Sequence, residues 1–142
     1  MSEENSIRFD YPVKILVAWG EAISGNASIR DWLMKNGYPE LGLFTFALRN
    51  KDEAKIWLME NNFPHLLALI NGIEGNPQAL KWMELNGFKK LRLMALTADH
   101  DEKSGRLLAK NDKLLLMLAL KMGSIKDSIE EDNNDVHKIS PD

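Results

Sequence analysis

The chain has 142 residues, of which 44% are apolar and 27% are charged, a composition typical of one globular domain with a core of its own. It has no cysteine, which excludes disulfides, thiolate metal sites and thiol nucleophiles. The net charge of −3 gives no reason to expect nucleic-acid binding, and no apolar run approaches the roughly 20 residues of a membrane span, so we expect a cytoplasmic protein without a membrane partner.

The polar, acidic start of the chain predicts a loose arm over residues 1 to 10. An apolar segment follows, in which Leu16, Trp19 and Ile23 recur at helical spacing. Shifted by 25 residues, these positions coincide with apolar positions further along the chain. We therefore interpret residues 11–25 as a half unit that contains only the second helix of a repeat.

Three copies of a similar ten-residue sequence recur at intervals of 25 residues. They begin at Trp32, Trp57 and Trp82, and a weaker copy begins at Leu107. In each copy a short amphipathic stripe ends at an asparagine, and a second apolar stripe follows after a tight turn. The sequence therefore predicts units of helix, turn and helix over residues 26–50, 51–75, 76–100 and 101–123.

Two short helices cannot bury their apolar stripes alone, so each unit must stack on its neighbours. The predicted fold is all-α, an α-solenoid of about four stacked helix-turn-helix repeats with a 25-residue period. We expect the tryptophan column to lie buried between the helix pairs. The column of small residues at Ala47, Gly72 and Thr97 should let neighbouring helices approach closely.

Gly123 predicts the end of the last helix, and the polar sequence after it predicts a disordered tail. This tail is acidic, because six carboxylates against two lysines give it a charge of −4 and leave +1 for the rest. The predicted organisation is a helical-repeat domain over residues 1–123 and an acidic tail over residues 124–142.

One polar column is invariant, the asparagines at positions 36, 61, 86 and 111. A structural interpretation is that each asparagine caps the end of a first helix by bonding to the backbone. The alternative is a ladder of side chains that grips an extended peptide. We favour the structural interpretation, because each asparagine stands where a helix must end.

Residues 75–87 (GNPQALKWMELNG) and 54–62 (AKIWLMENN) resemble the second helix of an ankyrin repeat with its Asn-Gly exit. The resemblance covers roughly residues 25 to 122. The units are about eight residues shorter than ankyrin units, at the place of the ankyrin β-hairpin finger, and the Thr-Pro-Leu-His signature is absent. The resemblance implies an ankyrin-like helical array without hairpins, onto which no ankyrin binding residue can be carried over.

No catalytic, phosphate-binding or metal-binding motif is present, so we expect neither an enzyme nor a cofactor or bound metal. His100, between Asp99 and Asp101, could serve as a metal ligand or a general base. We favour a polar loop in which Asp101 caps the next helix. His65 lies in a variable column, and we expect it at the surface.

The expected function is a non-enzymatic module that binds another protein, which is as yet unidentified, with homodimerisation through an exposed end as a further possibility. The candidate contact residues lie in two variable columns: Asp31, Ile56, Lys81 and Arg106, and Lys35, Glu60, Leu85 and Lys110. The alternative function is nucleic-acid binding through a small basic patch, made by Lys89, Lys90 and Arg92.

Overall fold

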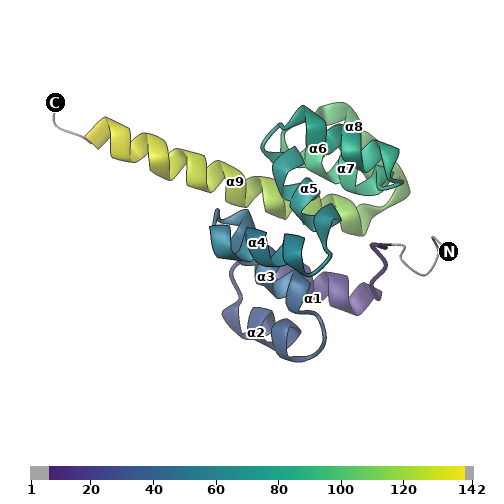
Figure 1. The fold of residues 1–142 in the computed structure, drawn as a ribbon. Coiled ribbons are helices and arrows are strands. Elements are labelled where there is room, and N and C mark those ends of the chain that lie inside the picture. The colour runs from purple at the N-terminus through teal and green to yellow at the C-terminus, as the bar shows by residue number, and fades with distance from the viewer. Residues whose placement is uncertain (1–6, 140–142) are drawn as a thin grey trace.

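A computed structural model describes the backbone of residues 7 to 139 and the side chains of residues 7 to 133, and every regular element in it is a helix (Figure 1). This confirms the prediction of an all-α protein. Five helices form an inner set: α1 (Val13–Ile23), α3 (Pro39–Leu48), α5 (Pro64–Ile73), α7 (Lys89–Ala98) and α9 (Lys113–Ile139). Four form an outer set: α2 (Ala27–Lys35), α4 (Asp52–Glu60), α6 (Pro77–Leu85) and α8 (Glu102–Asn111).

The helix bounds follow the 25-residue spacing of the sequence. The outer helices α2, α4, α6 and α8 start at residues 27, 52, 77 and 102, and the inner helices α3, α5 and α7 start at 39, 64 and 89. Side chains fix several of these starts, because Asn26, Asn76 and Asp101 each accept a hydrogen bond from the backbone N–H three residues later.

The inner helices close into a ring. Each contacts the next inner helix along the chain, and α9 contacts α1. At this closing contact Lys121 Nζ donates a hydrogen bond of 2.7 Å to Ser24 Oγ, and a Cβ at Gly20 would lie 3.2 Å from Leu118 Cδ2. Each outer helix packs on the two inner helices that flank it in sequence.

The outer helices reach the core through a column that the sequence did not single out. Its members are exposed by no more than 1%: Leu33, Leu58, Met83 and Leu108. The prediction of a buried tryptophan column is therefore wrong, since Trp32 is 49% exposed and its two equivalents are half-buried. One residue of rotation, about 100°, separates the two columns on each helix.

The tryptophan rings lie instead over the turns. Trp57 stacks on Phe63 at 5.9 Å and Trp82 on Phe88 at 5.6 Å, with ring planes within 10° of parallel. The small column does permit close packing, because a Cβ at Gly72 would lie 2.9 Å from both Ala95 Cβ and Met83 Cε. The asparagine column is structural: each Nδ2 donates to the carbonyl four residues earlier, at 2.7 to 2.9 Å.

Helix α9 does not stop at Gly123, and the prediction of a disordered tail is wrong for residues 124 to 139. Gly123 serves a different purpose, because a Cβ there would lie 2.8 Å from the Ala98 carbonyl oxygen. The glycine thus lets α9 cross α7 at close range. Beyond this crossing α9 projects away from the other helices (Figure 1). None of the helices over residues 7 to 139 is long and apolar enough to cross a membrane.

A buried lysine fastens α9 just beyond the crossing. Lys126 is 8% exposed; its ammonium donates a 2.8 Å hydrogen bond to the Ile73 carbonyl at the end of α5 and pairs with the Asp99 carboxylate. One residue later, Asp127 lies 2.9 Å from His100 Nε2. These contacts explain why the helix continues where composition alone predicts disorder.

We expect Lys126→Met to lower the free energy of unfolding by about 1–2 kcal/mol, because it leaves the Ile73 carbonyl without its donor while retaining most of the apolar stem. Urea denaturation measures the loss, and hydrogen exchange should accelerate along residues 124 to 133. Lys110→Met, at an exposed position of α8, is the matched control and should change stability by less than about 0.5 kcal/mol. Equal stability of the two variants would show that the buried contact contributes nothing.

The arm that precedes α1 is packed in its described part. Phe9 lies 5.4 Å from the ring of Tyr11 and 5.9 Å from that of Trp19, and the Tyr11 hydroxyl donates a 2.7 Å hydrogen bond to Glu40. The prediction of a loose arm is therefore wrong at Phe9, while Arg8 and Asp10 are exposed and residues 1 to 6 lie outside the described part.

Candidate protein-binding face

The ring leaves one pair of inner helices uncovered. Helix α2 covers the pair α1 and α3, and α4, α6 and α8 cover the next three pairs in the same way. Within the described residues no helix precedes α1, so nothing takes the equivalent place over α1 and α9. This is the side on which α1 and α9, the first and last helices of the described residues, contact each other.

Val17 marks the uncovered place on α1. Its equivalent in α3 is Gly42, where a Cβ would overlap Met34 Cγ of α2. The equivalent in α7 is Arg92, whose Nε lies 3.7 Å from Glu84 Oε1 of α6. This position therefore faces the outer helix of its own unit, and on α1 it carries an apolar side chain that is 45% exposed.

Val13 shows the same pattern one turn earlier. Its equivalents are Tyr38, Phe63 and Phe88, all half-buried, and the two phenylalanines stack on tryptophans of the outer helices. Val13 is 68% exposed, and no outer helix of the described part of the chain lies above it. Two valines that face solvent on one side of a helix are typical of a surface that another element covers.

Helix α9 contributes the other half of this surface. A hollow of about 400 Å³ runs along it, lined by Lys113, Leu116, Met117, Leu120, Lys121 and Ser124. The hollow borders α1, because a Cβ at Gly20 would lie 3.5 Å from both Met117 Cε and Lys121 Cδ. Leu120 is 55% exposed. We call the surface formed by Val13, Val17, Leu116, Met117 and Leu120 the α1/α9 face.

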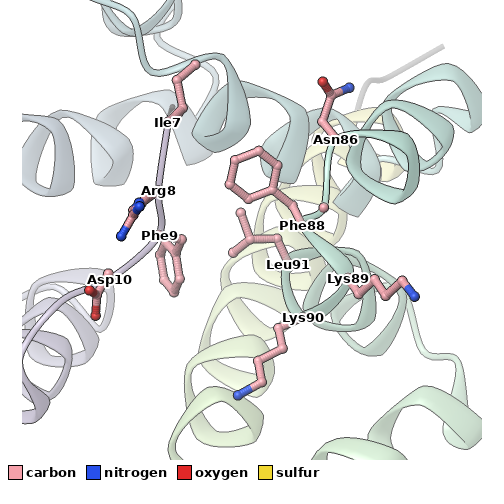
Figure 2. Close-up of a pocket in the computed structure, with 10 residues that line it drawn as sticks. Ile7, Arg8, Phe9, Asp10, Asn86, Phe88, Lys89, Lys90 and Leu91 are labelled. Atoms are coloured by element: carbon pink, nitrogen blue, oxygen red, sulfur yellow. The ribbon is translucent and has the colours of Figure 1, made fainter. Parts of the chain in front are cut away.

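A second hollow, of about 530 Å³, lies between the N-terminal arm and the start of α7. Figure 2 shows the side chains of Phe9, Phe88 and Leu91 pointing into it, whereas those of Arg8 and Lys89 point away. Its interior is therefore apolar, although cations stand at its edge. The arm and the start of α7 thus enclose an apolar hollow, and this lining does not resemble a catalytic site.

His65 lies behind this hollow and is only 1% exposed, so its predicted surface position is wrong. Its ring stacks on Phe88 at 5.1 Å and lies 6.1 Å from Phe63, and neither ring nitrogen has a hydrogen-bond partner among the described residues. Burial lowers the pKa of His65 to about 4. The imidazole is therefore neutral at pH 7.

The eight residues predicted to contact a partner are all exposed and lie on the four outer helices. Lys81 and Leu85 line one hollow, beside Arg92, and Arg106 and Lys110 line another. Neither hollow includes a residue of a second outer helix. The outer helices pack mainly on inner helices, so the two columns are spread over separate ridges.

Two of the three cations in the predicted basic patch form ion pairs within the chain. Lys90 Nζ lies 3.4 Å from Asp112 Oδ2, and Arg92 is held by Glu84, while Lys89 is exposed. Two of the three cations are thus partly neutralised within the chain, which weakens the electrostatic argument for binding a polyanion.

The loop around His100 has the structure that was favoured. Asp101 Oδ2 accepts hydrogen bonds from the Ser104 hydroxyl and, at 3.0 Å, from the Ser104 backbone N–H, and these two bonds lower the pKa of Asp101. His100 has a φ of +73°, in the left-handed position that Gly25, Asn50 and Gly75 fill in the earlier units. Among the described residues no three histidines or carboxylates lie together in a way that would hold a metal ion.

Comparison of the chain with protein-family models, with curated proteins and with solved structures gives no match.

Proposed function

We propose that this protein is a non-enzymatic protein-interaction module and that its α1/α9 face docks a helix of another polypeptide. One observation supports this most strongly: four pairs of inner helices are covered by an outer helix of the chain, and α1 with α9 has none among the described residues. A helix that buries apolar side chains in a groove is a common mode of protein recognition.

We infer that the fold is a short α-solenoid whose first and last helices meet. It resembles an ankyrin array without hairpins. The 25-residue spacing of the helices and the contact between α1 and α9 support it. In such a ring the docked helix would complete the outer layer.

The face also indicates the character of its partner. Its apolar centre suits leucine- or methionine-sized side chains, like those that α2, α4, α6 and α8 bury elsewhere. Lys113 and Lys121 line the same hollow, and Glu21, 4.0 Å from Lys121, is the acid beside them. A helix with an apolar ridge flanked by carboxylates would match this pattern.

Site-specific photo-cross-linking tests whether a partner binds at the α1/α9 face. A benzophenone amino acid replaces Leu120 in one protein and Leu85 in another, because both leucines are exposed, at 55% and 73%, and only Leu120 lies on the α1/α9 face. After irradiation in native cells, we expect one dominant cross-linked polypeptide from position 120, reduced by a second change, Val17→Glu. Cross-linking from position 85 alone would instead support the outer-helix columns and contradict the proposal.

A further inference from the structure

The exposed side of α9 has a charge pattern that is complementary to itself. Residues three or four apart share one face of a helix, and a single stripe contains Lys113, Leu116, Leu120, Ser124, Asp127 and Glu131. The stripe is basic at its first residue and apolar in the middle. It is acidic at its end, where Asp127 lies 2.9 Å from His100 Nε2 within the chain and Glu131 is the exposed carboxylate. Lys113, Leu120 and Glu131 are exposed along it.

Two such stripes match when they run in opposite directions. The basic start of each then meets the acidic end of the other. With Lys113 opposite Glu131 the midpoint falls at residue 122, so Leu120 of each helix packs against Ser124 of the other. The small side chain of Ser124 lies next to this centre and allows the helix axes to approach. A parallel arrangement would instead place like charges together at both ends.

We propose that two copies of this chain form a two-fold symmetric dimer in which their α9 helices pair antiparallel across the α1/α9 faces. The inference rests on the proposed function and names a second copy as the occupant of that face. Each α9 supplies for the other copy a helix at the place where the described residues have no outer helix. Such an isologous contact closes on itself and does not lead to filaments.

The direction of the pairing agrees with the architecture of the units. Within a unit the outer helix and the following inner helix pack together across a short turn, so the chain doubles back. An α9 helix from a second copy that runs antiparallel to α9 has the direction of an outer helix. The later turns of α9 project away from the other helices, in a position from which they can reach a second molecule (Figure 1).

Charge exchange at the two ends of the stripe provides the test. In the dimer Lys113 of one copy meets the partner's Glu131, so Lys113→Glu and Glu131→Lys each place like charges at both ends. We expect either change to raise the dissociation constant of the dimer by about tenfold, as judged by sedimentation velocity over a series of concentrations. An equimolar mixture of the two variants should associate like the original protein, because both ends are again matched.

The double variant Lys113→Glu with Glu131→Lys has the composition of the original chain and should dimerise equally well. Both positions are exposed, and thermal unfolding of each variant checks that the fold is retained. Leu120→Glu should abolish the dimer, and Leu85→Glu, at an exposed leucine of α6, should leave it intact.

Two results would overturn the inference: a monomer at every concentration, or an association that the charge changes do not alter. The cross-linking experiment separates this failure from that of the proposed function. A monomer whose position 120 cross-links to a different protein leaves the proposed function standing. A dimer that persists in Leu120→Glu, with cross-linking from position 85 alone, contradicts both.

Discussion

Lowering the pH from 7 to 4 should cost the folded protein about 3 kcal/mol through His65 alone. Its pKa is about 4 in the folded state and 6.5 in a free chain. Below pH 6.5 His65 is therefore protonated in the unfolded chain but remains neutral in the folded chain. The free energy of unfolding falls until the pH reaches about 4. The physical cause is burial without a hydrogen bond to either ring nitrogen.

The measurement is a set of urea denaturation curves between pH 4 and 8 for the original protein and for His65→Phe. The variant keeps a flat ring against Phe88 and has nothing to protonate, so it should lose about 3 kcal/mol less over this range. His100→Asn is the comparison at an exposed histidine, and asparagine fills the equivalent left-handed position at residue 50. Because this change also removes the contact with Asp127, its stability is compared across the whole pH range and not at a single pH. Parallel pH profiles for the original protein and His65→Phe would show that His65 does not cause the loss of stability at low pH.

Gly123→Ala should destabilise the protein by about 2 kcal/mol. This loss is expected although alanine in a helix interior is more stable than glycine by about 1 kcal/mol. The added Cβ would lie 2.8 Å from the Ala98 carbonyl oxygen and 3.1 Å from Ala98 Cα, so α7 and α9 must separate. A glycine that merely ended a helix in solvent would give no such loss.

Gly105→Ala in α8 is the matched control, because its Cβ would meet only Thr97, at an ordinary 3.6 Å from Cγ2 and 4.0 Å from Oγ1. We expect this change to stabilise the protein by up to about 1 kcal/mol, the gain in helix propensity. Thermal or urea unfolding of the two variants gives both values. A gain in stability from Gly123→Ala would show that α9 does not cross α7 at this distance.

The period of the sequence predicted the helices well, because each unit carries its own local signals. Asn76 with Pro77 marks a helix start, and Asn86 ends the same helix by bonding to the Trp82 carbonyl. These signals act within one or two turns and are readable without knowledge of the fold.

Features that depend on contacts distant in sequence were not predictable in the same way. The columns of Trp57 and Leu58 are adjacent, and only the position of the inner helices decides which is buried. Gly123 has the composition of a helix end, yet its role is set by Ala98, and Lys126 is held by Ile73 and Asp99.

The candidate site, too, was predictable only where its signals are local in the sequence. The sequence indicated a half unit over residues 11–25, and this was the signal that no outer helix precedes α1 within the described residues. It did not indicate that α9 closes the ring against α1, so Val17 and Leu120 could not be placed on one surface. The predicted contact residues lie instead on the outer helices, where they are exposed but divided among separate ridges.

The most direct measurement of whether another polypeptide covers the α1/α9 face uses the absence of native cysteine. Single-cysteine variants Leu120→Cys and Leu85→Cys are labelled with a maleimide in dilute buffer and in concentrated native cell extract. We predict that extract slows labelling at position 120 severalfold more than at position 85, because only the former is covered. Equal slowing at both positions, or none at either, would contradict docking on this face.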